Sequence, residues 1–538
     1  MQLKEKIGEH KYKLAAVAAL FFAGVFFVLT TFRKHGGDFE NYYYGSKFYL
    51  EGKFDRDIYE CYKFNHLVEL EGEKGLFCNY TPVPPFTAIF FAPFAAMEHE
   101  TARLVFDLFG LVFFCFALWK FLSHLKLENV YLLALPLLLL FPLRSNISEG
   151  QLYFWLTGAL LLAFVLHQNG KYFMAGLLFA ISIHLKIFPA VFLIYLLLVP
   201  GYKTFIYTIA WSLLLLFSLH LLIPHDVLHH YFTGILPRLM NGEINDPFAT
   251  AYQSSSVFLR QMLLQDANLN PHALFNLPKL FFGFDLLFKL IFLISGIFVS
   301  RSKKFNSAFV LMWWMMVMML LSGYGAEYSL MIWGLITFVL AMNAEGRGTT
   351  IFIFIGSLIC IIPANVYMNV SFPLNFPRFF LELTLFVIAW LWFRPRFDRT
   401  SFFIVTPLFI LAFVIQLAKQ DRFREWNSEY VFPEERNLMT FAYEFNRDSC
   451  IKLYTRGRNG METHTYFPPA KISEDRSISC DEHAIYYNGA RIYLSGGKIV
   501  CVSRMGNDQV IFLSDEGRGP GMYALRSIRD KYLALPLK

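Results

Sequence analysis

Long apolar stretches separated by short polar segments dominate this 538-residue chain up to about residue 418. Leu14–Phe32, Leu104–Leu122 and Phe205–Ile223 are three such stretches. Each has close to the roughly 20 residues that a helix needs to cross a bilayer. Because lipid offers the backbone no hydrogen-bond partners, the stretches are predicted to be helical. Counting all of them predicts an all-α polytopic membrane protein with about thirteen transmembrane helices.

Two large polar loops interrupt this pattern, the first over residues 33–81 and the second over residues 224–280. After the second loop the predicted spans are 281–300, 305–322, 327–343, 349–365, 377–394 and 402–418. A polar tail follows the last of them. The sequence therefore predicts a transmembrane catalytic domain over 1–418 and a separate C-terminal domain over 419–538.

The tail has short runs of β-forming residues with turn signals between them. Asn488-Gly489 and Gly496-Gly497 are the two clearest turns. The runs are Ala484–Tyr487, Arg491–Leu494, Ile499–Ser503 and Val510–Leu513. We expect a small α+β domain, which serves either as an accessory or as a contact for the acceptor substrate.

Basic residues near the ends of the apolar stretches predict the orientation of the chain. The first stretch follows a lysine-rich start, and Thr31–Lys34 offers no small-residue cleavage site, which favours an uncleaved span with a cytoplasmic N-terminus. Placing the basic segments Arg301–Lys304 and Arg394–Arg399 on the same side puts both large loops and the tail outside. The expected location is a cell membrane, with an extracytoplasmic C-terminal domain.

One stretch conflicts with this orientation if every stretch is a crossing. If Val130–Phe141 and both halves of the apolar stretch around His184–Lys186 are all counted as crossings, the second large loop would lie on the cytoplasmic side instead of outside. Val130–Phe141 is short and bounded by Pro136 and Pro142, so we expect a re-entrant half-helix, which is tolerated where it lines a polar cavity. Residues 144–151 then lie on the outer side.

Composition agrees with a membrane protein and excludes some classes of site. The chain is 56% hydrophobic and 17% charged, whereas a soluble chain is about 25% charged. The net charge of +7 lies largely in short loops, so it indicates cytoplasmic anchors and no nucleic acid partner. With no P-loop, no phosphate-binding glycine fingerprint and no cysteine pair at zinc spacing, no cofactor and no metal are expected. A disulfide between Cys61 and Cys78 in the first outer loop stays open.

Six polar clusters fall on the predicted outer side, and they supply carboxylates, cations and aromatic rings. A lipid phosphate leaving group needs cations, and an acceptor hydroxyl needs a base. A site just above the bilayer also lets a lipid-borne donor reach it. The candidate residues are Asp38, Tyr80, Arg144, Glu149, Gln151, His184, Lys186, Gln253, Ser255, Arg260, Glu327 and Tyr328.

Structural roles are open for several of these residues. Asp38 could cap the interfacial helix that follows it, and Tyr80 stands where prolines begin the second span. Lys186 lies within a long apolar run, where a lysine is either functional or directed to the headgroups. Glu327 could simply complement the dipole of the helix that it begins.

The order of these clusters resembles the polyprenol-phosphate-sugar-dependent glycosyltransferases of the GT-C type, nearest to glycosyltransferase family 87 and its bacterial mannosyltransferases. The resemblance covers roughly residues 14 to 345. Its features are Asp38 at the start of the first outer loop, Tyr80-Thr81-Pro82, Gly150-Gln151, Lys186 to Pro189, and Gln253-Ser254-Ser255 with Arg260.

The resemblance implies a GT-C fold and an inverting transfer of a hexose, by default mannose. The donor would be a polyprenyl-phosphate sugar, and the acceptor a lipid-linked or cell-envelope glycan. Asp38 would be the general base on the acceptor hydroxyl. Lys186, with Arg144 or Arg260, would hold the donor phosphate.

The chain departs from the family at the outer turn 322–328, where the usual histidines are absent and Glu327 could bind the sugar instead. Two other functions are considered. A transporter or flippase of lipid-linked glycans would favour internal repeats and midplane polar sites, and neither is found. A membrane scaffold that only presents the tail would leave Lys186 and the carboxylates unexplained.

Overall fold

The computed structural model describes residues 11–536 apart from several gaps. The gaps are 60–63, 65–66, 69, 73–75, 77, 126–129, 243–246, 266–269, 271–272, 324, 369, 396–402, 404, 408, 415–438, 447–449, 458–459, 467–476, 482, 496–498, 506–508, 515–520 and 529–530. Cys61 therefore lies outside the described residues.

The chain forms two compact units, and both are assembled from separate stretches of sequence. The first unit comprises Met1–Lys34, Pro84–Ile223 and Thr250–Arg424. The second comprises His35–Val83, Pro224–Ala249 and Glu425–Lys538. Most of the first large loop and the first part of the second, Pro224–Ala249, thus belong to a different unit from the helices that flank them. Whether 1–418 and 419–538 fold as independent domains stays a prediction.

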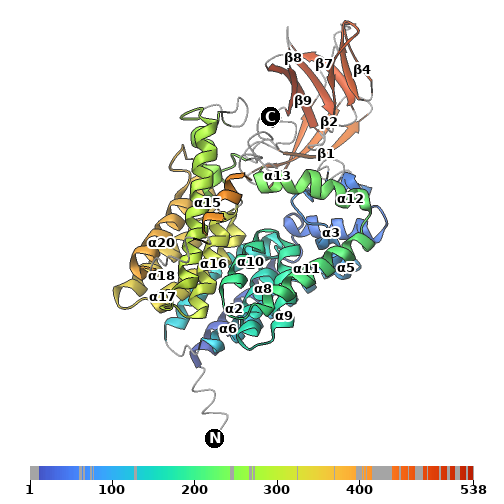
Figure 1. Cartoon of the computed structure of the whole chain (residues 1–538). Coiled ribbons are helices and arrows are strands. Elements are labelled where there is room, and N and C mark those ends of the chain that lie inside the picture. Colours follow the sequence, from blue (N-terminus) through green and yellow to red (C-terminus); the bar gives the residue numbers. More distant parts are fainter. Residues whose placement is uncertain are drawn as a thin grey trace. The chain divides into compact units, whose positions relative to one another are not determined.

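The first unit is helical. Its first half consists of α2 (Lys11–Thr31), α5 (Phe86–Ala95), α6 (His99–His124), η2 (Val130–Leu133), α7 (Ala134–Glu149), α8 (Tyr153–Gln168), α9 (Tyr172–Leu185), η3 (Phe188–Val191), α10 (Phe192–Leu198) and α11 (Lys203–Leu222). Its second half consists of α14 (Ser255–Leu263), α15 (Pro278–Arg301), α16 (Ser307–Leu321), η5 (Glu327–Ser329), α17 (Leu330–Asn343), α18 (Arg347–Ile361), α19 (Ala364–Tyr367) and α20 (Pro377–Phe393). In Figure 1, α15 to α18 and α20 pack as neighbours, and α8 packs between α6 and α9.

Five helices are long and apolar enough to cross a membrane, which confirms the expected membrane protein. They are Lys11–Thr31, His99–His124, Val130–Glu149, Lys203–Leu222 and Pro278–Arg301. Further apolar helices, among them Ser307–Leu321 and Arg347–Ile361, are shorter. The count of thirteen crossings therefore stays a prediction.

The centre of the first unit is packed with large apolar side chains. α16 is buried on all sides, and Trp313 and Trp314 within it are fully buried, as expected of a helix that is apolar all round. α17 and α18 approach so closely that a Cβ atom on Gly356 would lie 2.0 Å from Cγ2 of Thr337. Only glycine allows this contact.

Polar contacts assign the helix termini of the first unit to two ends. Lys34 after α2 contacts Glu149 at the end of α7 at 3.4 Å, and Arg33 lies 3.6 Å from Glu100 at the start of α6. We call this the Lys34 end. At the opposite end, Lys304 before α16 donates to the carbonyl of Phe393 at 2.8 Å.

These contacts correct one sequence-based expectation. Residues 130–141 are no short re-entrant segment, because the helix continues through Pro142 to Glu149 and reaches the Lys34 end. The element that does not cross is α5, which has only ten residues. Phe86 at its start contacts His184 at the end of α9, and the next helix begins beside Arg33. Both ends of α5 therefore lie toward the Lys34 end.

The second unit has a helical part and a strand part. The helices are α3 (Asp38–Leu50), η1 (Arg56–Tyr59), α12 (His225–His230), the π-helical turn η4 (Tyr231–Ile235) and α13 (Leu236–Asn241). Aromatic rings hold them together, since Tyr59 contacts both Tyr80 and Tyr231 with ring centroids 5.6 Å apart. The helix expected after Asp38 is present as α3, and its place at the membrane interface stays a prediction.

The strands form three antiparallel sheets. They are β1 (Met439–Asn446), β2 (Cys450–Gly457), β3 (Gly460–Tyr466), β4 (Ile478–Cys480), β5 (Ala484–Tyr487), β6 (Ala490–Leu494), β7 (Ile499–Met505), β8 (Gln509–Ser514), β9 (Gly521–Ile528) and β10 (Lys531–Pro536). Asn488 and Gly489 both have positive φ and form the predicted turn between β5 and β6. The strand part of the expected α+β domain is confirmed, and the described residues from 439 onward contain no helix.

Candidate functional site

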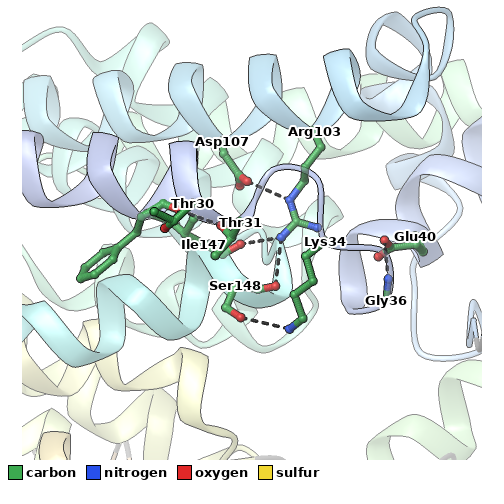
Figure 2. A network of polar contacts seen from close by, with 10 residues as sticks. Thr30, Thr31, Lys34, Gly36, Glu40, Arg103, Asp107, Ile147 and Ser148 are labelled. Atoms are coloured by element: carbon green, nitrogen blue, oxygen red, sulfur yellow. Dashed lines mark hydrogen bonds and ion pairs between the residues drawn. The ribbon is translucent and has the colours of Figure 1, made fainter. Parts of the chain in front are cut away.

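The C-terminus of α7 meets the segment that follows α2 at the Lys34 end. The ammonium of Lys34 donates to the Ser148 hydroxyl at 3.1 Å (Figure 2). It also lies 3.4 Å from the Glu149 carboxylate. Both charged side chains are partly exposed. This contact brings a predicted site residue, Glu149, beside Lys34, which follows the end of α2.

The buried side chain of Arg103 on α6 also contacts the C-terminal end of α7. Its Nε atom donates to Asp107 one turn along α6 at 2.8 Å, and both side chains are fully buried. Its Nη2 atom donates to the carbonyls of Ile147 at 2.5 Å and Ser148 at 3.1 Å (Figure 2). The last carbonyls of a helix have no partner within the helix, so Arg103 supplies donors for two of them.

A tight turn follows α7. Gly150 adopts φ 62°, and the amides of Gly150 and Gln151 donate to the carbonyls of Ile147 and Asn146. This pattern is the Schellman motif, which requires the left-handed conformation that glycine adopts readily. Gln151 is buried behind the turn. We call residues 148–151 the 148–151 turn.

An aromatic pair joins this region to Lys186. Lys186 lies between α9 and η3, and its ammonium is 5.8 Å from the ring centroid of Tyr153. The Tyr153 ring contacts the Tyr328 ring at 5.3 Å. The Tyr328 carbonyl accepts from the Asn146 amide at 2.7 Å, one turn before the 148–151 turn. Lys186, Tyr153, Tyr328 and Asn146 are therefore connected through direct contacts, and Glu149 lies about one helical turn beyond Asn146 on α7.

Two further candidates lie near this group and differ in environment. His184 is half-buried, and its Nε2 atom is 3.1 Å from the Ser212 carbonyl of α11. Arg144 is exposed on α7. The structure therefore brings together Glu149, Gln151, Lys186 and Tyr328 at the Lys34 end, and it places a cation on the surface of the same helix as Glu149.

Asp38 belongs to the second unit and is the first residue of α3. Gly36 and Gly37 before it have φ values of 94° and 128°, and the Gly36 amide donates to the Glu40 carboxylate at 2.9 Å (Figure 2). Asp38 makes no side-chain cap on α3, whose N-cap residue is Gly37. Instead its Oδ1 atom accepts from Asn41 at 3.0 Å, so the carboxylate is oriented along the first turn.

Asn41 carries this contact on to the Tyr80 motif. Its Oδ1 atom accepts from the backbone amide of Asn79 at 2.6 Å. Tyr80 itself is fully buried, and its ring lies against Phe54, Tyr59 and Phe64. Tyr80 is therefore part of the core of the second unit.

The second-loop candidates form a separate group around α14. Gln253 is buried and donates to the carbonyls of Thr250 and Asn375, which ties the loop to the segment before α20. Ser254 caps α14, and Ser255 is buried behind it. Arg260 lies 5.2 Å from the ring centroid of Phe281 on α15. These residues hold α14 in place.

Asp285 of α15 completes that group. It accepts from Ser256 at 2.5 Å and from Lys289 at 2.5 Å, and its side chain is almost fully buried. The group therefore combines Arg260 and Lys289 with one carboxylate at the contact of α14 with α15.

Glu327 stands in an ion pair. Its Oε1 atom accepts from Nη2 of the fully buried Arg378 on α20 at 2.7 Å and from the Ala364 amide at 2.5 Å. Arg378 also donates to the Ile362 carbonyl. Glu327 therefore connects the start of α17 to α19 and α20.

Arg103, Asp107, Tyr153, Arg378 and Lys34 were not identified from the sequence. A signal existed for the first two, because opposite charges at positions i and i+4 stand inside an apolar span. Tyr153 and Arg378 act through contacts with residues far away in the sequence, which a linear pattern does not reveal. Within the described parts of the chain, no group of three or more His, Cys, Asp or Glu side chains could hold a metal ion.

Comparison with known proteins gives one match. The model of glycosyltransferase family 87 matches residues 80–323, which include α5 to α16 and the candidates from Tyr80 to Arg260. No curated protein and no solved structure matches the chain. The match confirms the resemblance inferred from the order of the motifs and indicates a glycosyltransferase. Residues 80–323 of the chain are thus similar to glycosyltransferase family 87.

Proposed function

We propose that the protein transfers a hexose, by default mannose, from a polyprenyl-phosphate donor to a lipid-linked or cell-envelope glycan with inversion at the anomeric carbon. The observation that carries this proposal is the linked group of Lys186, Tyr153, Tyr328 and Asn146 at one end of the bundle, on the last turns of the helix that ends at Glu149. This group lies inside or directly beside the part matched by the family model. A phosphate leaving group, a lipid carrier and a sugar each find a complementary feature there.

The distribution of charge supports a site on the outer face of the membrane. The helix ends opposite the Lys34 end carry basic residues, namely Lys171, Lys203, Arg301, Lys303, Lys304, Arg347 and Arg394. Cytoplasmic loops are enriched in lysine and arginine. The Lys34 end, which mixes acidic and basic side chains, then faces outward, where sugars on polyprenyl phosphates are used.

Lys186 is the proposed ligand of the donor phosphate. It stands at a break between two helices, its backbone is extended, and the residue is partly buried. An ammonium in such a position stabilises negative charge that develops as the phosphate leaves. The Tyr153 ring at 5.8 Å stabilises the ammonium by a cation–π contact when no phosphate is bound.

Asp38 is the proposed general base. It is the first residue of α3 in the second unit and follows two glycines, Gly36 and Gly37. Asn41 donates to one carboxylate oxygen at 3.0 Å and so fixes its direction. A carboxylate held in this way could accept the proton of an acceptor hydroxyl as that hydroxyl attacks the sugar.

The test uses the full-length protein in lipid nanodiscs with synthetic polyprenyl-phosphate mannose and a lipid extract as acceptor source. Mass spectrometry follows the loss of the donor and the gain of one hexose on an acceptor. The proposal expects transfer by the native chain and none by Asp38→Asn. Transfer from a nucleotide sugar without any polyprenyl-phosphate donor would contradict it.

A further inference from the structure

Arg103 makes contacts that go beyond holding two helices together. It belongs to α6, yet its Nη2 atom donates to the carbonyls of Ile147 and Ser148 in the last turn of α7. Side chains of lysine or arginine can satisfy the last carbonyls of a helix and complement the negative end of its dipole. Here the capping side chain comes from a different helix.

Asp107 fixes the direction of the guanidinium. It accepts from Nε at 2.8 Å, and Nε shares an edge of the guanidinium with the Nη2 atom that donates to the α7 carbonyls. The planar fork of arginine directs its donors rigidly, so a hydrogen bond at Nε determines where the Nη2 donors point. With both side chains fully buried, solvent cannot replace either contact.

The capped helix end leads directly into the 148–151 turn. Ile147 accepts both from Arg103 and from the amide of Gly150, and Ser148 accepts from Arg103 through its carbonyl and from Lys34 through its hydroxyl. One residue of α6 therefore determines how far α7 extends before the chain turns. The same turn sets the positions of Glu149 and Gln151.

We propose that Arg103, oriented by Asp107, is a positioning residue for the candidate site: it caps α7 and holds the 148–151 turn against Lys34. It does not touch the substrate. Its effect on transfer rests on the proposed function, whereas its effect on the turn does not. A misplacement of about 1 Å in a supporting group can lower the rate of an enzyme about 100-fold.

The test is hydrogen exchange of the full-length protein in nanodiscs, followed in peptides that cover residues 144–152. The variant is Arg103→Leu with Asp107→Leu, because replacing both members of a buried ion pair by apolar residues commonly leaves the fold stable. We expect the amides of Gly150 and Gln151 to exchange at least about 10-fold faster than in the native chain. Unchanged exchange would overturn the proposal.

The matched control is Asp285→Leu with Lys289→Leu. This is a second ion pair of spacing i, i+4 within a long apolar helix among the described residues; it lies on α15, with Asp285 buried and Lys289 partly exposed. It should leave exchange of peptides over 144–152 at the native rate. Faster exchange there in the control would assign the effect to general loosening and contradict a specific role of Arg103.

Arg103→Lys provides a second test, which can be carried out even if the double variant is not produced as a folded protein. A lysine keeps the charge but lacks the rigid fork, so exchange of the turn should fall between the native and double-leucine values. Native exchange in Arg103→Lys would contradict the proposed geometry.

Transfer activity supplies the remaining readout. With donor and acceptor as in the proposed function, kcat of the double variant should fall about 10- to 100-fold while donor KM changes less than about 3-fold. A native kcat together with faster exchange would show that the position of the 148–151 turn does not affect transfer, and would contradict a positioning role of Arg103 in catalysis. If the native chain itself shows no transfer, the proposed function fails and the exchange result still decides the role of Arg103.

Discussion

Arg378 and Glu327 are joined by a hydrogen-bonded ion pair at 2.7 Å, with the arginine side chain fully buried. The pair connects α20 to the start of α17, where Tyr328 contacts the ring of Tyr153. α20 lies beyond the residues matched by the family model. α20 therefore fixes the turn at Glu327 through Arg378, and the next residue, Tyr328, contacts Tyr153 in the candidate site.

Removing one member of this pair should destabilise the protein. We expect Arg378→Met to cost about 3–5 kcal/mol, because it removes the arginine donors from Glu327 and from the Ile362 carbonyl. Thermal unfolding of the full-length protein in nanodiscs measures the change. The double variant Arg378→Met with Glu327→Met should recover most of the loss. A double variant as unstable as the single one would show that the pair itself contributes little.

Replacement of Lys186 should weaken use of the donor. A hydrogen bond to a charged group contributes about 1.5–3 kcal/mol, so Lys186→Met should lower the affinity for polyprenyl phosphate about 10- to 100-fold. Native mass spectrometry of the protein with polyprenyl phosphate measures this. Lys279→Met, at the exposed start of α15, is the control and should bind normally. Equal binding by Lys186→Met would mean that the lysine serves only to reach the headgroups.

Asp38→Asn should abolish most transfer without affecting folding. Loss of a general base typically lowers the rate about 10²- to 10⁴-fold, and asparagine keeps the size of the side chain. Kinetics with polyprenyl-phosphate mannose provide the measurement. Asp57→Asn, an exposed aspartate in η1 of the same unit, is the matched control and should remain active. Activity retained in Asp38→Asn would exclude this residue as the base.

Stability of the second unit should depend on Glu71 in acid. The hydrogen bond from Lys47 lowers the pKa of Glu71 below its usual 4.5, burial opposes this, and Lys53 adds to the lowering. A carboxyl with a lowered folded-state pKa contributes stability above pH 4.5 and loses it as the pH falls below that value. Native Tm should therefore exceed that of Glu71→Gln at pH 6, and the difference should shrink below pH 4.5. A difference that grows in acid would reverse the assignment.

Labelling of single cysteines should place positions 35 and 100 on the same face of the membrane. Arg33 contacts Glu100, and α5 between them does not cross. Cysteines at both positions should react with a membrane-impermeant maleimide in intact cells, whereas one at Lys303 should react only after permeabilisation. Opposite behaviour of positions 35 and 100 would show that α5 spans the bilayer.

The sequence identified the features that depend on local pattern. The helix after Asp38, the β5–β6 turn at Asn488-Gly489 and the order of the family motifs all follow from short stretches, and the structure or the comparison agrees with each. Lys186 stood out because a lysine in an apolar run requires an explanation, and it does lie at a helix break beside Tyr153.

Features that depend on distant contacts were not predictable in this way. The prolines around 130–141 favoured a re-entrant segment, yet Pro136 falls in the first turn of α7, where proline is tolerated. Tyr80 has the signature of a rigid interfacial residue, but rings from distant positions enclose it. Glu327 was expected to complement a helix dipole or bind a sugar, and only the fold reveals Arg378 as its partner.

The shared direction of α2 and α7 has a consequence for how the protein assembles in the membrane. Because both helices end at the Lys34 end, they cannot enter the bilayer together as a hairpin. α2 must remain without a helical partner in the bilayer until α6 has been synthesised, and its high hydropathy and lack of charged residues over Leu14–Thr31 make it stable there on its own. The contact of Lys34 with the 148–151 turn then forms only after four helical segments are in place, so the site is completed late in biogenesis.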